Sequence, residues 1–230
     1  MRRFGLIGHP IAHSGSPALF AEWCGGKWPY DLIEGAGFEA SWQRFLDGYD
    51  AINITAPFKE AAFKKVLESG IMEAEVREIG AINIAVKTKE GIKGYNSDYL
   101  GVRKLLQDNG FGPGSNVVAA GWGGAGRAAA AAARAEGCTV TVCNRSLKAP
   151  GIRPLEELPS LAAKADLLIY TLPTPVPEIA LLASPGTTAG PVILEANYRD
   201  PCLAGTGLPY ITGTAWLRAQ AVTGFPLMIE

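Results

Sequence analysis

The order of short apolar runs and amphipathic stretches constrains the fold of this chain more than any other feature of its sequence. The apolar runs 4–7, 30–33 and 51–54 are predicted to be buried strands, and helical patterns at 17–23 and 38–46 separate them. Strands that alternate with helices in this way predict a parallel α/β sheet. The first part of the chain is therefore expected to form an α/β domain.

Two further apolar runs, 81–87 and 91–95, flank the turn-like segment Thr88-Lys89-Glu90-Gly91. A short turn between two such runs predicts an antiparallel hairpin. We expect this hairpin to form the edge of the sheet in the first domain.

A second alternating series follows a predicted helix at 99–109 and a loop at 110–114 that is rich in helix breakers. This series contains predicted strands at 117–120, 139–143, 166–171 and 192–196, and predicted helices at 125–136 and 214–222. The last helix is too short to form a domain and is expected to fold back onto the first one. We therefore predict one domain of residues 1–98 with 206–230, and a second of residues 99–205.

The composition is that of a protein with a substantial core, since 48% of the 230 residues are hydrophobic. A formal net charge of -1 and the lack of a basic block argue against nucleic acid as a partner. Gly5 interrupts the first apolar run, which does not suit a signal peptide. No run approaches the roughly 18 apolar residues of a membrane span. We therefore expect a cytoplasmic protein with no membrane partner.

Cysteine and histidine usage gives no sign of a metal centre. The four cysteines lack CxxC spacing, and reduced, buried thiols are the interpretation that suits a cytosolic protein. They are Cys24, Cys138, Cys143 and Cys202. Only two histidines occur, and no His, Cys and carboxylate cluster has metal-ligand spacing. We expect no metal site.

A glycine-rich segment, Gly121-Trp122-Gly123-Gly124-Ala125-Gly126, has the spacing G-x-G-x-x-G between an apolar strand and a helix. In that context Gly121 allows a tight turn, Gly123 leaves room for a pyrophosphate, and Gly126 lets the helix lie close to the strand. The free N–H groups at the helix N-terminus would bind the phosphates. The alternative is an ordinary glycine-rich turn. The strand and helix around the motif favour a Rossmann-type dinucleotide site.

The end of the next strand indicates which dinucleotide would bind. An NAD site has an acidic residue there, which accepts hydrogen bonds from the ribose hydroxyls. Here the strand at 139–143 runs into Asn144-Arg145-Ser146, without an acid. Arginine can stack on adenine and pair with the 2′-phosphate of NADP, which a carboxylate would repel. The alternative is a solvated arginine in a turn; its position favours NADP.

Three polar segments of the first domain lie where predicted strands end. They are Ser14-Gly15-Ser16-Pro17, the segment 53–59, and Asn96-Ser97-Asp98. In open α/β sheets the carboxyl ends of the strands form the ligand crevice, so these segments are expected to converge on a cleft between the two domains.

Each segment also has a purely structural interpretation. Ser16 before Pro17 has the pattern of a helix N-cap followed by proline at the first helical position. Asn96 and Asp98 could cap the helix that begins near residue 99. Lys59 could be an exposed lysine in a first helical turn, although a cation is slightly disfavoured there.

Taken in series, these segments resemble the successive signatures of the shikimate dehydrogenase family. The resemblance spans almost the whole chain. It is carried by Phe4-Gly5-Leu6-Ile7-Gly8 with Pro10, His13-Ser14-Gly15-Ser16-Pro17, Asn53-x-Thr55-x-Pro57-Phe58-Lys59, Gly80-Ala81-Ile82-Asn83, Gly94-Tyr95-Asn96-Ser97-Asp98, the glycine loop, Asn144-Arg145-Ser146, and Gly213 followed by Gln220.

The resemblance implies an NADP-dependent enzyme that interconverts 3-dehydroshikimate and shikimate, with Lys59 and Asp98 as its catalytic pair. Lysine would relay the proton of the reacting hydroxyl, and aspartate would orient it. The implied substrate-binding residues are Ser14, Ser16, Thr55, Asn83, Tyr198 and Gln220. The implied cofactor-binding residues are Gly121, Gly123, Gly124, Ala125, Gly126, Asn144, Arg145, Ser146, Thr171 and Gly213.

The chain departs from the family pattern in three respects. It is short, both before residue 30 and after Gln220; Trp122 replaces a small residue of the glycine loop; and Ser97 replaces the usual threonine. A side chain at position 122 can point away from the pyrophosphate. The expected oligomeric state is a monomer or a homodimer.

Three alternatives remain open. A quinate-oxidising member of the same family would differ in the space around Ser14 and Ser16. A non-catalytic NADPH-binding sensor would have no need of the Lys59 and Asp98 pair. A structural α/β domain with accidental glycines would need neither the pair nor the loop.

Overall fold

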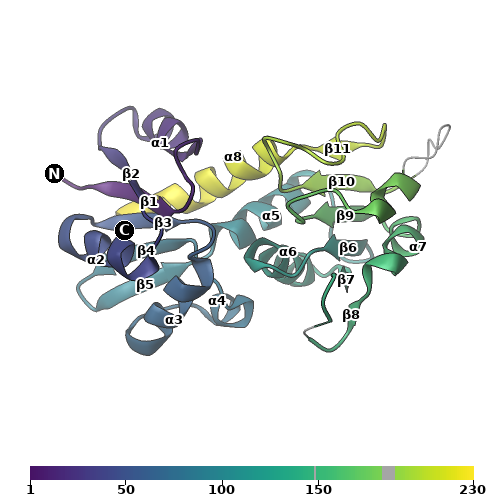
Figure 1. The fold of residues 1–230 in the computed structure, drawn as a ribbon, viewed down its shortest axis with the longest axis horizontal. Helices are drawn as coiled ribbons and strands as arrows, with labels where there is room; N and C mark the ends of the chain where they lie inside the picture. The colour runs from purple at the N-terminus through teal and green to yellow at the C-terminus, as the bar shows by residue number, and fades with distance from the viewer. Residues whose placement is uncertain (148, 183–189) are drawn as a thin grey trace. The chain divides into compact units, whose positions relative to one another are not determined.

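The chain forms two α/β units in the computed structural model, which describes residues 1–147, 149–182 and 190–230 (Figure 1). The predicted α/β class and the C-terminal helix are confirmed.

Contacts between Cα atoms define the two units. Unit 1 comprises Met1–Leu100 and Gln220–Glu230, and unit 2 comprises Gly101–Ala219. These limits differ from the predicted domain limits, which stay predictions. Unit 2 includes the residues just before the last helix, because a short strand there pairs with the second sheet.

Unit 1 is built on a five-stranded sheet with the order β2-β1-β3-β4-β5. Its first strand pairs in parallel with its two neighbours, and the last two strands form the antiparallel edge hairpin that the sequence predicts. The strands are β1 (Phe4–Gly8), β2 (Tyr30–Glu34), β3 (Ala51–Ile54), β4 (Ile84–Thr88) and β5 (Gly91–Tyr95).

The first hairpin strand begins at Ile84 rather than at Ala81. The reason is local hydrogen bonding, because the Ile82 N–H donates to the carbonyl of Lys59 at 3.2 Å. The Ala81 carbonyl likewise accepts from the Asn96 side chain at 2.9 Å. Residues 81–83 are therefore held by side-chain and loop hydrogen bonds, and periodicity alone does not distinguish them from a strand.

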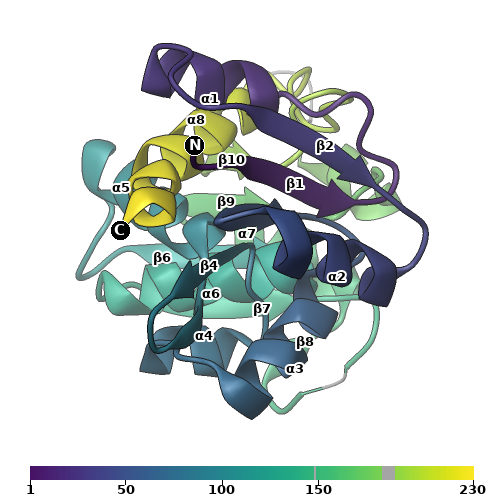
Figure 2. The ribbon, with the colours of Figure 1, turned by 90° about the vertical axis from the view of Figure 1, so that its left-hand side faces the viewer.

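Helices cover both faces of this sheet, with α1 and α8 on one side and α2 and α3 on the other (Figure 2). Strand residues alternate between the two cores: Ile84 packs with Phe20 and Phe225, and Ala85 packs with Phe45. The helices are α1 (Ser16–Cys24), α2 (Phe38–Gly48), α3 (Lys59–Ser69), α4 (Ala74–Ile79) and the 3-10 helix η3 (Phe225–Ile229). Two further helices, α5 (Ser97–Asp108) and α8 (Gly213–Gly224), each contain residues of both units.

Unit 2 has a six-stranded sheet with the order β11-β10-β9-β6-β7-β8, in which all neighbouring strands are parallel. Its strands are β6 (Asn116–Ala120), β7 (Thr139–Cys143), β8 (Ile152–Arg153), β9 (Leu167–Tyr170), β10 (Val192–Glu195) and β11 (Tyr210–Ile211). The other elements are α6 (Gly124–Ala135), α7 (Leu158–Ala162), and the 3-10 helices η1 (Leu155–Glu157) and η2 (Pro177–Leu181).

The short elements of unit 2 were not predicted from the sequence. Two-residue strands such as β8 and β11 carry too few residues to show a period of two. The α6 helix packs on the sheet through buried alanines, whose small side chains allow the close approach that the sequence predicts.

The C-terminal segment contributes to the core of unit 1. Phe225 is 4% exposed, and its ring meets that of Phe20 edge-on at 5.1 Å between centroids. We expect Phe225→Ala to lower the free energy of unfolding by about 3–5 kcal/mol, because it leaves a cavity in this core. Val222→Ala, at a residue that is 56% exposed, should change it by less than about 0.5 kcal/mol. Urea unfolding followed by far-ultraviolet circular dichroism measures both, and equal stability of the two variants would contradict the packing role of the C-terminal segment.

Candidate active site

Lys59 and Asp98 form an ion pair in unit 1. Lys59 is the first residue of α3, Asp98 is the second residue of α5, and Nζ lies 2.5 Å from Oδ2. The lysine side chain is 21% exposed and the aspartate side chain 7% exposed. The predicted catalytic pair is thus brought together, with a nearly buried carboxylate and a cation that reaches solvent.

Backbone and amide hydrogen bonds fix the elements that carry this pair. Asn96 caps α5, because its Oδ1 accepts from the Tyr99 N–H at 3.0 Å. The structural interpretation of Asn96 as a helix cap is therefore correct. The Phe58 N–H donates to the Thr55 carbonyl at 2.9 Å and closes the turn that begins α3.

Asn83 joins β3 to the start of α5. Its Oδ1 accepts from the Ser97 N–H at 2.6 Å, and its carbonyl accepts from the Ile54 N–H at 2.8 Å. The residue is 4% exposed. Asn83 therefore holds the residue next to Asp98 in place, whatever it contributes to a ligand.

Ser14 and Ser16 lie together before α1, but Ser16 is not the helix N-cap that the sequence suggests. Gly15 occupies the N-cap position, and within the described residues no side chain caps this end. Instead the Ser14 hydroxyl donates to the Ser16 Oγ at 3.2 Å and accepts from the Ser16 N–H at 3.2 Å. Two neighbouring hydroxyls, both half-buried, are thus held side by side.

Two residues without a predicted role, Tyr30 and Asn53, extend this hydroxyl pair into a network. The Tyr30 hydroxyl donates to Asn53 Oδ1 at 2.7 Å, and Asn53 Nδ2 donates to the Asn83 carbonyl at 3.4 Å. Burial raises the pKa of Tyr30, and a hydrogen bond with Ser16 partly offsets that rise. The motif Asn53-x-Thr55 contained a signal for Asn53; nothing local in the sequence points to Tyr30.

Thr55 and Gln220 complete the predicted substrate set of unit 1. Thr55 directly follows β3, where its N–H donates to the Ile7 carbonyl at 2.9 Å. Gln220 is half-buried in α8, one turn before Gly224. A Cβ placed on Gly224 would lie 2.7 Å from the Cβ of Ser97, so this part of α8 lies against the start of α5.

The glycine loop of unit 2 leaves the sheet at the same edge as the loops that follow two neighbouring strands. Ala120, the last residue of β6, is in register with Cys143 of β7 and with Tyr170 of β9. The predicted cofactor residues from 121, 144 and 171 onward therefore begin at one edge of the sheet. This is the carboxyl edge, where open parallel sheets bind nucleotides.

Close packing explains two of the three motif glycines. Gly121 has a φ of 109°, and a Cβ there would lie 2.3 Å from Thr171 Oγ1. A Cβ on Gly126 would lie 2.2 Å from the Gly121 carbonyl oxygen. Thr171 Oγ1 donates to the Ala120 carbonyl at 2.9 Å. This hydrogen bond fixes the residue that precedes the glycine loop.

Gly123 is different, because among the described residues other than its two chain neighbours none places an atom within 4 Å of a Cβ built on it. It is the N-cap of α6 and is exposed, and among the described side chains none bonds to this helix end. Gly124 and Ala125 form the first turn of the helix. The loop thus offers open space beside free N–H groups, which fits a pyrophosphate.

Asn144, Arg145 and Ser146 form the turn after β7. Asn144 Nδ2 donates to the Ser146 carbonyl at 2.9 Å, which fixes the turn, and the Arg145 and Ser146 side chains are exposed. An exposed guanidinium beside a hydroxyl fits a phosphate group.

Trp122 packs its side chain against the hydrophobic core of unit 2. Its half-buried indole packs against a cluster that includes Ala130 of α6, Val142 of β7 and Ile152 of β8. This packing is consistent with the expectation that a side chain at position 122 can point away from the pyrophosphate.

Tyr198 and Gly213 lie close together in unit 2. A Cβ on Gly213 would lie 2.7 Å from the Tyr198 backbone nitrogen, and the Tyr198 side chain is exposed. The fully buried Glu195 organises this loop by accepting from the Cys202 and Leu203 N–H groups at 2.5 and 3.0 Å. The substrate role of Tyr198 and the cofactor role of Gly213 stay predictions.

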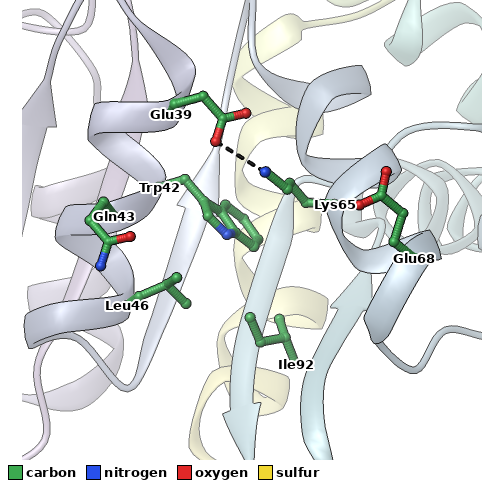
Figure 3. Close-up of a pocket in the computed structure, with 7 residues that line it drawn as sticks. All are labelled: Glu39, Trp42, Gln43, Leu46, Lys65, Glu68 and Ile92. Atoms are coloured by element: carbon green, nitrogen blue, oxygen red, sulfur yellow. Dashed lines mark ion pairs between the residues drawn. The ribbon is translucent and has the colours of Figure 1, made fainter.

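A separate cavity of unit 1, about 310 Å³ in volume, lies between α2, α3 and β5 (Figure 3). Trp42, Leu46 and Ile92 contribute its apolar wall, and a Glu39–Lys65 ion pair of 3.1 Å spans its rim. None of the predicted site residues lines it. Lys65 is therefore a lysine of the same helix as Lys59 that stands outside the predicted site.

The described residues offer neither a metal cluster nor a membrane-spanning helix, and the four cysteines are not paired. Across residues 1–147, 149–182 and 190–230, no group of three His, Cys, Asp or Glu side chains could hold a metal ion. In the same residues no helix is long and apolar enough to span a membrane. All four cysteines are free; Cys138 and Cys143 are buried, whereas Cys24 and Cys202 are only partly buried.

The contrast between Gly126 and Gly123 gives a matched pair of variants. Gly126→Ala forces a Cβ against the Gly121 carbonyl and should lower the free energy of unfolding by about 1–3 kcal/mol. Gly123→Ala has a permitted φ of -76° and open space, so its stability should stay unchanged while dinucleotide binding weakens. Thermal unfolding and NADPH titration measure the two effects, and loss of stability in Gly123→Ala alone would contradict this assignment.

Comparison with known proteins agrees with this arrangement. Residues 6–85 match the model of the shikimate dehydrogenase substrate-binding domain. The NADP-dependent shikimate dehydrogenase of Acidiphilium cryptum is 31% identical, over 97% of this chain and 89% of that protein. The corresponding enzyme of Halothermothrix orenii is also 31% identical, over 98% and 86%.

A crystal structure of shikimate 5-dehydrogenase from Thermus thermophilus, in complex with NADP(H) and shikimate, superposes with a TM-score of 0.80. It is 28% identical in sequence, and the match covers 99% of this chain and 93% of that one. The fold of the Aquifex aeolicus shikimate dehydrogenase is also similar, with a TM-score of 0.83 at 23% identity. The chain belongs to the shikimate dehydrogenase family.

Proposed function

We propose that this chain catalyses the reversible, NADP-dependent interconversion of 3-dehydroshikimate and shikimate. The observation that carries the proposal is the Lys59–Asp98 pair. Asp98 directly follows Ser97, whose N–H donates to Asn83, and Asn83 continues through Asn53 to Tyr30 in a network of amide and hydroxyl groups. A proton-transfer pair next to groups that bind hydroxyls and carboxylates suits a hydroxylated acid. It distinguishes the enzyme from a sensor, which has no need to move a proton.

Lys59 acts as the general acid and base. Its ammonium group donates a hydrogen bond to the oxygen on the reacting carbon and stabilises negative charge that develops there during reduction. It then gives that oxygen a proton, and in the oxidation direction the neutral amine accepts the hydroxyl proton. NADP, when bound, accepts or donates the hydride.

Asp98 orients the lysine. Its carboxylate is nearly buried and lies at 2.5 Å from Nζ, so it holds the amine in place beside the substrate. Its other oxygen is suited to accept a hydrogen bond from a neighbouring hydroxyl of the substrate.

The remaining predicted residues would bind the rest of the substrate. Ser14 and Ser16 would donate to the substrate carboxylate from hydroxyls that the fold already holds together. Thr55, Asn83 and Gln220 would bind ring hydroxyls, and Tyr198 would assist the serines.

Unit 2 would bind NADP through the glycine loop and the turn after β7. Gly121, Gly123, Gly124, Ala125 and Gly126 would hold the pyrophosphate at the start of α6, and Thr171 and Gly213 would line the same site. Asn144, Arg145 and Ser146 would bind the adenosine 2′-phosphate, for which the exposed guanidinium is the principal charge.

We further propose that the protein acts in the cytoplasm as a monomer or a homodimer. Four free cysteines suit a reducing compartment, and an NADP-linked reaction on a small acid needs no membrane or nucleic-acid partner.

Removal of the Lys59 amine should abolish most turnover and leave cofactor binding intact. We expect Lys59→Ala to reduce kcat with shikimate by about 10²–10⁴-fold, because the proton relay is lost. Reduction of NADP at 340 nm measures the rate, with quinate as a second substrate, and quenching of tryptophan fluorescence measures NADPH binding. Lys65→Ala, in the same helix but outside the site, should retain full activity. Equal losses of turnover and NADPH binding in Lys59→Ala would overturn its assigned role.

Reversal of the charge at Arg145 should change cofactor preference. We expect Arg145→Glu to weaken NADPH binding by at least about tenfold with little change for NADH, since the carboxylate repels only the 2′-phosphate. Arg134→Glu makes the same charge change at the exposed end of α6 and should leave the preference unaltered. An unchanged preference in Arg145→Glu would rule out this residue as the 2′-phosphate ligand.

A further inference from the structure

A buried carboxylate stands at the end of β10, where the loop that carries Tyr198 begins. Glu195 is the last residue of β10 and is in register with Tyr170, the last residue of β9. Its exposed fraction is 0%. Because parallel strands end at one edge of the sheet, Glu195 lies at the carboxyl edge that also carries the glycine loop. None of the proposed catalytic, substrate or cofactor roles belongs to it.

Each carboxylate oxygen of Glu195 accepts two hydrogen bonds, and all four donors are neutral. Oε1 accepts from the Cys202 N–H at 2.5 Å and from Asn197 Nδ2 at 3.4 Å. Oε2 accepts from the Leu203 N–H at 3.0 Å and from the Tyr210 hydroxyl at 2.7 Å. The carboxylate therefore joins the two ends of the loop 196–203 to each other and to β11.

Tyr198 belongs to a part of this loop whose backbone is held on both sides. Before it, Asn197 Nδ2 donates to the Leu172 carbonyl at 2.9 Å. Gly213 packs against the same place so closely that a Cβ there would lie 2.6 Å from the Asn197 carbonyl oxygen and 2.7 Å from the Tyr198 nitrogen. After it, the hydrogen bonds to Glu195 hold the chain. The backbone is thus fixed, while Tyr198 is 39% exposed and its side chain stays available to a ligand.

The apolar packing of this region does not by itself require a carboxylate. Leu203, which binds Glu195 through its N–H, belongs to the main apolar core of unit 2, and Tyr210 packs against that core. An apolar side chain of similar volume could pack there, whereas a carboxylate must be taken out of water at a cost. What the carboxylate adds is an acceptor for the N–H groups of a loop that has neither helix nor strand over residues 196–203.

We propose that Glu195 is a positioning residue for substrate binding: its carboxylate holds the loop 196–203 in the conformation in which the Tyr198 hydroxyl reaches the substrate. The inference rests on the proposed function, because it assumes that Tyr198 assists in binding the substrate carboxylate. It adds to that function a residue that acts through the loop and touches neither substrate nor cofactor.

Glu195→Gln tests this role, since an amide of the same shape offers one acceptor oxygen and one NH₂ group. Each oxygen of Glu195 accepts from a backbone N–H, so either orientation of the amide sets two donors against each other. The carboxylate that Tyr198 would bind is not on the reacting carbon. We therefore expect KM for shikimate to rise at least about fivefold, with kcat and the Kd for NADPH within about twofold of the wild type. Reduction of NADP at 340 nm measures kcat and KM, and quenching of tryptophan fluorescence measures NADPH binding.

Asp166→Asn is the matched control. Asp166 Oδ2 also holds a backbone N–H of unit 2, that of Asn116 at 2.7 Å, but at the opposite, amino edge of the sheet. This substitution should lower the temperature of thermal unfolding and leave KM for shikimate unchanged. A rise of KM equal to that of Glu195→Gln would mean that general loosening of unit 2 sets KM, and the proposal would fail.

A double variant separates positioning from a purely structural effect. If Glu195 acts through the Tyr198 hydroxyl, Glu195→Gln combined with Tyr198→Phe should have the KM of Tyr198→Phe alone, to within about twofold. Effects on KM that multiply would contradict the proposal. Where Glu195→Gln does not fold, Tyr210→Phe takes its place, because it removes one donor to Oε2 and keeps the ring. It should raise KM by about two- to fivefold, and an unchanged KM would contradict the proposal.

The outcomes separate the inference from the proposed function. An unchanged KM in folded Glu195→Gln, or a joint fall of kcat and NADPH affinity, would overturn the role of Glu195 while wild-type turnover of shikimate stands. A wild-type KM in Tyr198→Phe would also overturn it, by removing the contact through which Glu195 acts. Failure of the wild-type protein to oxidise shikimate with NADP would overturn the proposed function itself.

Discussion

Parallel strand pairing is the constraint on which both halves of this protein depend. Parallel strands bring their carboxyl ends to a single edge of the sheet, so loops that are far apart in sequence start next to one another. In unit 2 the register of Ala120 with Cys143 and Tyr170 gathers the glycine loop, the arginine turn and the loop that begins at Thr171. In unit 1 the pairing of Ile7 with Ile54 brings together the loops that lead to the two serines and to Lys59. The loops that carry the predicted site residues therefore start next to one another in each unit.

The polar groups at these edges stabilise the fold as well as forming the site. Asn96 caps α5 and ties it to residue 81, and Asn83 joins β3 to the same helix, while both are almost fully buried. Glu195 has the corresponding role in unit 2, where Tyr210 donates to it at 2.7 Å and burial raises the pKa of that phenol. Such groups are tolerated in a core because their hydrogen bonds are made within the protein. The rigid frame that results holds the reactive side chains in position.

The sequence predicts the long elements well, for a physical reason. Strands such as β1 and β7 are short apolar runs, and the glycine spacing reflects contacts between residues five apart, Gly121 and Gly126. Features that arise from distant contacts are not encoded locally. The sequence around Ser16 has the pattern of a helix cap, but in the structure its hydroxyl accepts a hydrogen bond from Ser14. Tyr30 contacts the site residues only because β2 places its hydroxyl beside Asn53. The two-residue strand β11 depends wholly on its partner β10.

The proposed role of the Lys59–Asp98 pair in proton transfer accounts for it better than a role in stability does. Removing a carboxylate from water costs several kcal/mol, and a partner cation commonly does no more than offset that cost. An apolar pair of similar volume would serve the fold as well at a position where Asp98 is only 7% exposed. What an apolar pair cannot do is hold a proton at a defined place and release it to a substrate oxygen. Because Lys59 remains 21% exposed, its amine can be reached by a ligand while its partner stays fixed in the protein. This asymmetry, a buried anchor and an accessible cation, is the arrangement that a proton relay requires.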